Sequence, residues 1–385
     1  MERRVLIYSH DTFGLGHLRR CRELAGAIVR ASPETTVLLL SGSPVASSFD
    51  FPPGVFVVGL PAVVKLSNGD YVSRKPGEGL MRTIGLRAQL IAQTVESFRP
   101  DALIVDKEPW GLRNELAGAL EKAKAKGAKL ILGLRDILDD PETLRVEWER
   151  KRALPALRDL YDEIWIYGLK SIYDPLDGLA IPADVAAKTV FTGYLRRAIP
   201  RVKAPHAAPF LLVTTGGGGD GDGLIGLTLS AYERAGKELL PALLVHGPFM
   251  DSRARAAFEE RAAAIPNVTT LSFDAYLETR LAAAKGIVAM GGYNTFCEIL
   301  SAEKPALIVP RTAPRREQAI RAERAEALGL AKMLLPPESG ADDAMIAALK
   351  RLPTQEKPAL HRFPGILNGL GVVTQRLAAL LGTRP

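Results

Sequence analysis

The chain has 385 residues, and its apolar share of 47% and charged share of 24% are those of a globular protein. At roughly 150 residues per domain, this length predicts two or three domains. Basic residues exceed acidic ones by 50 to 43, so the net charge of +7 favours anionic ligands or an anionic membrane surface. An aromatic share of 6%, without zinc-finger spacing or a lysine-arginine block, argues against a nucleic-acid partner.

The first half of the chain alternates short runs of Val, Ile and Leu with amphipathic stretches of ten or more residues. This alternation is typical of a parallel sheet that helices cover on both faces. Strands are predicted at Val5–Ser9, Val37–Ser41, Val55–Gly59, Ala102–Asp106, Lys129–Leu134, Ile164–Gly168 and Thr189–Thr192. Helices are predicted between several of them, at Leu18–Arg30, Leu80–Phe98 and Leu112–Lys126.

Residues 199–209 belong to a proline-rich, basic stretch that predicts a linker. A second series of strands follows at Phe210–Thr214, Ala242–His246, Val268–Leu271, Gly286–Met290, Ala306–Pro310 and Lys332–Leu335, with a helix predicted at Leu224–Lys237. The predicted fold class is therefore α/β, with two doubly wound Rossmann-like parallel-sheet domains facing a cleft. Their predicted ranges are 1–198 and 210–352.

Residues 353–385 form a predicted connector and terminal helix. One face of this helix is apolar, because it repeats Ile366, Leu370, Val373, Leu377 and Leu380 at spacings of four and three. Such a face needs a surface to cover. We therefore expect the helix to pack back toward the N-terminal domain.

The two cysteines, Cys21 and Cys297, lie in helix-like patterns and can form neither a disulfide framework nor a metal cluster. No apolar run approaches the length of a membrane span or a signal-peptide core. We expect a cytoplasmic protein, either free or peripheral on the inner face of the cell membrane. Residues Leu80–Arg87 mix apolar and basic side chains as interfacial helices do, although such a segment also packs on a sheet.

Ligands of open parallel sheets bind beyond the carboxyl ends of the strands, so the loops there are the candidate sites. In the first loop, Gly14 and Gly16 allow a tight turn, and His17 falls where a helix opens. His17 is either a general base or a helix cap that pairs with a carboxylate. Asp106 and Glu108, after a neighbouring strand, are candidates to orient it, and Asp106 is also a candidate base. Arg19, Arg20 and Arg22 are interpreted as a solvated helix face.

The loop after the linker holds Gly217, Gly218 and Gly219 within a glycine-rich run between a strand and a helix. Consecutive amide N–H groups beside a helix N-terminus bind anions. No Gly-Lys-Ser/Thr follows, so this loop is not a P-loop. Asp220 and Asp222 are interpreted as helix caps or sugar-hydroxyl acceptors rather than metal ligands.

A third loop begins with Gly291 and Gly292, after which Asn294 or Thr295 is predicted to cap a helix. Glu298 then either accepts hydrogen bonds from both hydroxyls of a ribose or only complements the helix dipole. One strand later, Glu317 and Gln318 start another helix and suit sugar hydroxyls. The arginines before them, such as Arg311, either neutralise a diphosphate or are simply exposed.

These loops, in this order, resemble those of the inverting nucleotide-sugar glycosyltransferases of the two-domain GT-B fold. The likeness is strongest to the family 28 type, which includes the lipid II N-acetylglucosaminyltransferase and the monogalactosyldiacylglycerol synthases. The residues that carry it lie between 266 and 332, and they are Phe273, Gly291-Gly292, Glu298, Pro305–Pro310 and Glu317-Gln318.

The resemblance implies that Phe273 lies by the base of a uridine diphosphate, that Glu298 holds the ribose, and that Glu317 and Gln318 hold the donor sugar. It also implies that the loop at 216–223 surrounds phosphate and that His17 lies on the acceptor side. The expected function is transfer of a hexose from a UDP-linked sugar to a hydroxyl of a lipid or saccharide, with inversion. No obligatory metal or other cofactor is expected. The alternatives are a nucleotide-sugar hydrolase or 2-epimerase, and a non-catalytic nucleotide-sugar-binding subunit.

Overall fold

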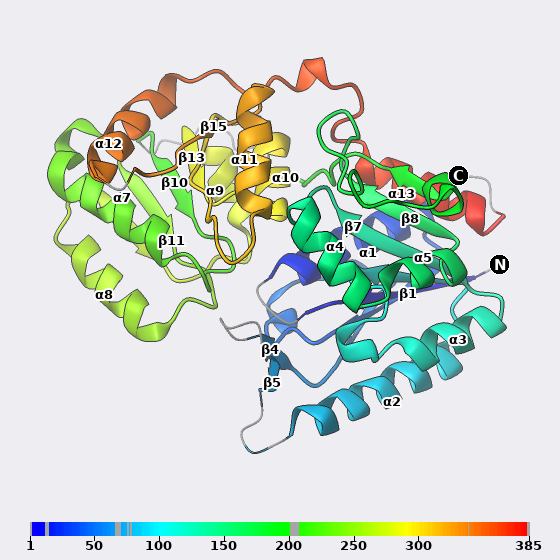
Figure 1. The fold of residues 1–385 in the computed structure, drawn as a ribbon. Helices are drawn as coiled ribbons and strands as arrows, with labels where there is room; N and C mark the ends of the chain where they lie inside the picture. The colour runs from blue at the N-terminus through cyan, green and yellow to red at the C-terminus, as the bar shows by residue number, and fades with distance from the viewer. Residues whose placement is uncertain are drawn as a thin grey trace. The chain divides into compact units, whose positions relative to one another are not determined.

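The computed structural model describes residues 2–11, 15–65, 71–74, 77, 79–200, 208–337 and 339–382 (Figure 1). The contacts within the chain divide it into two compact units. Unit 1 comprises Met1–Leu195 together with Gly365–Pro385, and unit 2 comprises Arg196–Pro364. The last part of the chain therefore belongs to the unit that the first part builds.

The described part of unit 1 holds a parallel sheet of seven strands. These are β1 (Arg3–Ser9), β2 (Thr35–Ser41), β3 (Val55–Gly59), β6 (Ala102–Asp106), β7 (Lys129–Arg135), β8 (Glu163–Tyr167) and β9 (Thr189–Phe191). Their order is β3-β2-β1-β6-β7-β8-β9. All of β6 and β8 and the centre of β1 are buried, because helices cover both faces of a parallel sheet.

The helices of unit 1 are α1 (Gly16–Ala31), α2 (Leu80–Phe98), α3 (Ala117–Ala125), α4 (Pro141–Arg150), α5 (Ala153–Asp159), α6 (Ala183–Ala187) and α13 (Gly369–Leu380). One of these helices differs from the sequence prediction. The helix expected from Leu112 starts only at Ala117, because Arg113 and Asn114 adopt positive φ in a turn before it. A small antiparallel hairpin of β4 (Val63–Lys65) and β5 (Tyr71–Ser73) was not predicted.

The terminal helix α13 packs against α1 within unit 1 (Figure 1). Val373 and Leu377 on its predicted apolar face are buried. At its ends, Arg376 forms an ion pair with Glu163 of β8, and Arg3 donates a hydrogen bond of 3.0 Å to the carbonyl oxygen of Leu381. Apolar and ionic contacts thus both attach this helix to the unit.

Unit 2 holds a second parallel sheet, of six strands among the described residues. These are β10 (Leu211–Thr214), β11 (Ala242–Val245), β12 (Val268–Leu271), β13 (Gly286–Ala289), β14 (Ala306–Ile308) and β15 (Lys332–Met333), in the order β12-β11-β10-β13-β14-β15. The helices are α7 (Asp222–Ala235), α8 (Ser252–Ala263), α9 (Leu277–Ala283), α10 (Tyr293–Ala302), α11 (Glu317–Ala327) and α12 (Ala341–Arg351).

Each sheet therefore has the Rossmann-like α/β form that the sequence predicts, and the fold class is confirmed. In each unit the first strand lies at the point where the strand order reverses, with β1 between β2 and β6 and β10 between β11 and β13. Ligands of such sheets bind outside the strand ends at this switch point. In the described part of the chain, none of the helices combines the length and the apolar character that crossing a membrane requires.

Candidate active site

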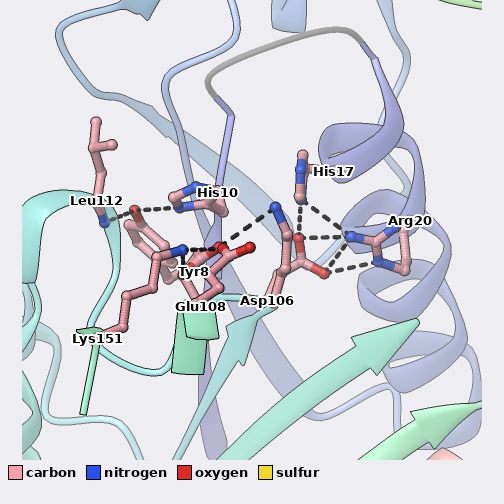
Figure 2. Close-up of polar contacts among 10 residues, drawn as sticks. Tyr8, His10, His17, Arg20, Asp106, Glu108, Leu112 and Lys151 are labelled. Carbon is pink, nitrogen blue, oxygen red and sulfur yellow. Dashed lines mark hydrogen bonds and ion pairs between the residues drawn. The ribbon is translucent and has the colours of Figure 1, made fainter. Parts of the chain in front are cut away.

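His17 and Asp106 lie together at the switch point of unit 1. Asp106 is the last residue of β6, and His17 is the second residue of α1, which follows the neighbouring strand β1. The Nδ1 atom of His17 forms a short hydrogen bond with Oδ2 of Asp106 (Figure 2). Gly16 opens the helix, and Gly14 lies outside the described residues. Of the two carboxylates that the sequence offered as partners of His17, the structure brings Asp106 to it.

Glu108, the other candidate, has different partners. Its carboxylate accepts a hydrogen bond of 2.7 Å from Lys151, and it lies 3.4 Å from the ammonium group of Lys107. These two cations hold its pKa below the usual range, although burial acts in the opposite direction. Glu108 thus stays charged beside the pair of His17 and Asp106 (Figure 2), and it contacts Asp106 through its backbone amide, which donates a hydrogen bond of 2.9 Å to the carbonyl oxygen of Asp106.

Arg20 completes the group around Asp106, and its place corrects the sequence interpretation of a solvated helix face. Its side chain is buried, with Nε 2.7 Å from Oδ1 and Nη2 2.8 Å from Oδ2 of Asp106. The helical spacing could have indicated that Arg20 is buried, because Arg20 lies one turn after His17 on the face that also buries Cys21 and Leu24. The guanidinium fork therefore holds the carboxylate in one orientation toward His17.

The charges in this group determine which atom carries the proton. The pKa of His17 is lowered to about 4, chiefly by burial and in part by the charge of Arg20, while Asp106 opposes both effects. Burial would raise the pKa of Asp106, but Arg20 and His17 outweigh it and hold that pKa below its usual range. At neutral pH Asp106 is therefore ionised and His17 is neutral. Because a carboxylate only accepts, Nδ1 of His17 carries the hydrogen and Nε2 has a free lone pair.

A second buried network, which sequence reasoning missed, lies next to His17. Arg87 holds Glu115 with two hydrogen bonds of 2.6 Å, and the hydroxyl of Tyr8 donates to Glu115 at 2.6 Å. The Nδ1 atom of His10 is 3.4 Å from that hydroxyl, and the rings of His10 and His17 have centroids 5.5 Å apart. Burial holds the pKa of His10 well below its usual value, so this histidine is also neutral at pH 7.

The position of Arg87 bears on the segment Leu80–Arg87, whose mixture of side chains suggested an interfacial helix. Arg87 is buried in its ion pair with Glu115 and does not face solvent. Met81 and Leu86 are exposed, by 71% and 43%. Ile84 of this segment packs with Val63 of the hairpin and with Leu112. Contact of the segment with an anionic membrane stays a prediction from the sequence.

In unit 2, the glycine-rich loop runs from β10 to α7 against the turn that follows β11. Gly218 has a φ of +90°, and a Cβ atom there would lie 2.4 Å from the carbonyl oxygen of His246. The carbonyl oxygen of Gly217 accepts a hydrogen bond of 2.9 Å from the amide of Phe249, and Gly219 is exposed. The loop is thus fixed at its base and open at Gly219.

The start of α7 corrects the predicted caps. Gly221 is the N-cap residue, and no side-chain hydrogen bond caps the helix among the described residues. Asp222 lies in the first turn instead, and Asp220 forms an ion pair with Arg311, with Oδ2 2.6 Å from Nε. The amides at this helix start are therefore not bonded to a capping carboxylate.

The helix that follows the double glycine after β13 also has a different N-cap from the predicted one. The N-cap of α10 is Gly292, and neither Asn294 nor Thr295 caps this helix, whose start lies wholly within the described residues. Asn294 instead accepts a hydrogen bond of 2.6 Å from Arg197. Gly291 has a φ of +79°, and a Cβ atom there would lie 2.7 Å from Cγ2 of Ile308. The chain thus turns closely over β14 before α10 begins.

The loops after β10, β13 and β14 lie next to one another in unit 2. The hydroxyl of Thr295 is 3.6 Å from the position that a Cβ atom of Gly216 would occupy. Arg311 donates a hydrogen bond of 2.5 Å to Glu317 and, through its amide, one of 3.2 Å to Gln318, and both of these residues start α11 as predicted.

Two residues that are predicted to bind the donor lie apart from these loops. One is buried inside a helix, and the other follows a strand farther along the sheet. Glu298 is fully buried within α10. Phe273 follows β12, and the strands β11 and β10 separate β12 from β13. The roles assigned to these residues by resemblance stay predictions.

Comparisons with known proteins identify the class. Residues 211–358 match the glycosyltransferase family 28 C-terminal domain. A sequence search of curated proteins gave no match.

Solved structures share the fold over the whole chain. A UDP-glucosyltransferase from Polygonum tinctorium, capable of glucosylating indoxyl, is 15% identical with a TM-score of 0.63, and the alignment covers 100% of this chain and 99% of that chain. Acinetobacter baumannii MurG is 14% identical with a TM-score of 0.57, over 99% of both chains. The UDP-GlcNAc 2-epimerase of Neisseria meningitidis, bound to UDP-GlcNAc, is 14% identical with a TM-score of 0.60, over 98% of this chain and 100% of that chain.

The match makes residues 211–358 similar to the C-terminal domain of family 28 glycosyltransferases, and the whole chain shares the GT-B fold with these solved structures. The sequence resemblance to that class is thereby confirmed.

Proposed function

We propose that the protein transfers a sugar from a UDP-linked donor to a hydroxyl group, with inversion at the anomeric carbon and without an obligatory divalent metal. The observation that carries this proposal is the pair of the partly buried His17 and the buried Asp106 at the switch point of unit 1. This pair presents a neutral imidazole whose Nε2 atom can accept a proton. Its partner carboxylate is charged and can stabilise the imidazolium that forms.

In the proposed step, the acceptor hydroxyl gives its proton to Nε2 of His17 while its oxygen forms a bond to the anomeric carbon. The bond between that carbon and the diphosphate oxygen breaks, and its electron pair stays with the diphosphate. A single displacement of this kind inverts the anomeric centre. Asp106 remains ionised throughout, because Arg20 holds its pKa low.

The leaving diphosphate gains negative charge, which unit 2 can stabilise with main-chain donors. The N-termini of α7 and α10 follow Gly221 and Gly292, and in the described structure no side-chain hydrogen bond caps either of them. Amides at a helix start and in a glycine-rich loop act as fixed positive dipoles. This electrostatic role is the one that a metal ion plays in other enzymes, and it supports metal-independent transfer.

The choice of a uridine diphosphate rests on the family likeness and on two similar structures. The Polygonum tinctorium protein is a UDP-glucosyltransferase, and the Neisseria meningitidis enzyme is bound to UDP-GlcNAc. Calorimetric titration with UDP, ADP, GDP and dTDP, each with and without a chelator, tests both points. We expect UDP to bind most tightly, with a Kd that the chelator leaves unchanged. Absence of binding to every nucleoside diphosphate would overturn the proposal.

A second candidate function is hydrolysis or 2-epimerisation of a nucleotide sugar, which the likeness to the 2-epimerase fold favours. These reactions need the donor site but no acceptor. Incubation with UDP-GlcNAc in the absence of any acceptor separates the candidates. Release of free sugar together with UDP at a rate above that of the His17→Ala variant would favour this second function, and no release is expected for a transferase.

A further inference from the structure

Arg311 occupies a central position among the loops at the carboxyl edge of the sheet in unit 2. It follows β14, and its guanidinium lies 2.6 Å from Asp220 in the glycine-rich loop after β10. The same guanidinium donates a hydrogen bond of 2.5 Å to Glu317 and one of 3.0 Å to the carbonyl oxygen of Arg315. This side chain therefore connects the glycine-rich loop to the start of α11.

Two carboxylates face this one guanidinium, that of Asp220 from the glycine-rich loop and that of Glu317 from α11. The Asp220 carboxylate lies beside the loop that would receive a diphosphate, and it would repel a polyanion there. A diphosphate bound to Arg311 therefore requires that Asp220 move away.

The two carboxylates differ in how firmly they are held. The Glu317 side chain is 6% exposed and lies in the first turn of α11, whereas the Asp220 side chain is 32% exposed. Asp220 directly follows Gly219, the exposed glycine at the open end of the loop, beyond the fixed Gly217 and Gly218. Asp220 is therefore the partner that can leave Arg311 at low cost.

We propose that Arg311 binds the diphosphate of the donor, and that Asp220 occupies its guanidinium only until the donor arrives. This inference rests on the proposed function, because it assumes a nucleoside diphosphate donor. A phosphate presents the same pair of oxygens to a guanidinium fork as a carboxylate does, so one can replace the other without moving Arg311. Glu317 continues to orient the guanidinium while the negative charge of the leaving group develops.

Arg321 does not share this role. It is buried and donates a hydrogen bond of 2.9 Å to the carbonyl oxygen of Gly291, so it supports the turn before α10. Arg311 is one-fifth exposed, and its ion pairs can exchange with a ligand from solvent.

The test compares UDP with uridine by calorimetry, in the wild type and in Arg311→Gln. We expect the Kd for UDP to rise about 10-fold to 100-fold, because charge-assisted hydrogen bonds to the diphosphate are lost, while the Kd for uridine stays unchanged. Arg311→Lys keeps the positive charge but loses the planar fork of donors. Its Kd for UDP should therefore lie between those of the wild type and of Arg311→Gln. The matched control is Arg234→Gln, which breaks an ion pair of 2.6 Å with Asp343 elsewhere in unit 2.

Asp220→Asn gives the opposite expectation. Removing the competing carboxylate should lower the Kd for UDP about 2-fold to 10-fold and leave uridine binding unchanged. A purely structural ion pair predicts instead that both variants melt at a lower temperature and bind UDP as the wild type does, and that result would overturn the inference. If the wild type binds no UDP, the proposed function itself fails; if it binds UDP and Arg311→Gln binds it equally well, only the role of Arg311 fails.

Discussion

His17 is the residue on which the proposed chemistry depends most directly. Replacing it with alanine removes the base but leaves unit 2 intact, so turnover of a UDP-sugar with a hydroxyl acceptor should fall by about 10² to 10⁴, with the Kd for UDP unchanged. His361 is an exposed histidine of unit 2, and His361→Ala is the matched control. Turnover of His17→Ala near the wild-type rate would remove His17 from the mechanism.

Asp11 gives a prediction about stability and pH. It is buried beside Ser41, whose hydroxyl donates a hydrogen bond of 2.6 Å to it, and burial raises its pKa to about 6 although Ser41 opposes the shift. A carboxyl whose pKa is raised on folding destabilises the folded state increasingly as pH rises from about 4 to above 6. Asp11→Asn should therefore stabilise the protein by up to about 3 kcal/mol at pH 8 and by little at pH 4.

Urea unfolding at the two pH values measures this difference. Asp177→Asn, at an exposed position, is the control and should change the free energy of unfolding little at either pH. An equal effect of Asp11→Asn at pH 4 and pH 8 would show that its charge is not the cause.

Arginine side chains account for much of what sequence reasoning missed at this scale. Arg20, Arg87 and Arg311 each pair with a carboxylate, and two of these carboxylates lie far along the chain, at Asp106 and at Asp220. A helical pattern shows that an arginine lies on an inner face, but it cannot show that a carboxylate from another part of the chain lies beside it. Without that partner, a solvated position is the default expectation for arginine.

The glycine-rich loop is the element whose geometry most constrains the proposed donor site. Gly218 has positive φ and lies against the carbonyl oxygen of His246, so a methyl group there forces the loop to shift. Gly218→Ala should weaken UDP binding by at least about 10-fold and cost about 1–2 kcal/mol of stability. Gly223→Ala is the matched control, because that glycine has open space around it in the first turn of α7.

For Gly223→Ala we expect a neutral or slightly stabilising effect and unchanged UDP binding. Thermal unfolding and UDP titration of both variants give the two readouts. If Gly218→Ala bound UDP as the wild type does, the loop at 216–219 would not be part of the donor site.

Strands were the elements that the sequence predicted best. Every predicted strand exists, because strands buried on both faces are continuous apolar runs, and Val55–Gly59, Ala102–Asp106 and Val268–Leu271 have the predicted bounds. The hairpin of β4 and β5 was missed because strands of three residues show too little alternation to be recognised. Helix starts were misjudged where glycine takes the N-cap position, as at Gly292, since a side-chain cap is the stronger sequence signal.

At the scale of the whole molecule, the two units differ in how the chain builds them. Unit 2 is continuous in sequence, whereas unit 1 needs residues 365–382, which follow unit 2. A fragment of residues 196–364 should therefore fold and bind UDP with nearly the wild-type Kd. A fragment of residues 1–195 should unfold at a lower temperature than unit 1 does in the full chain, because it lacks α13 over α1 and leaves Glu163 without Arg376.

Circular dichroism melts of the two fragments test this expectation. Adding a peptide of residues 365–382 should raise the melting temperature of the first fragment, whereas a peptide with Val373→Asp should not, since Val373 is buried. The expectation fails if residues 1–195 alone melt at the temperature of the full chain.

The return of the chain to unit 1 also sets an order of events during synthesis. Residues 1–195 are synthesised first, yet α13, which completes their fold, is synthesised only after the whole of unit 2. Unit 2 can fold while unit 1 still lacks α13, so that part of α1 remains uncovered. The nascent protein thus completes the unit that is proposed to bind the donor before it completes the unit that holds His17 and Asp106.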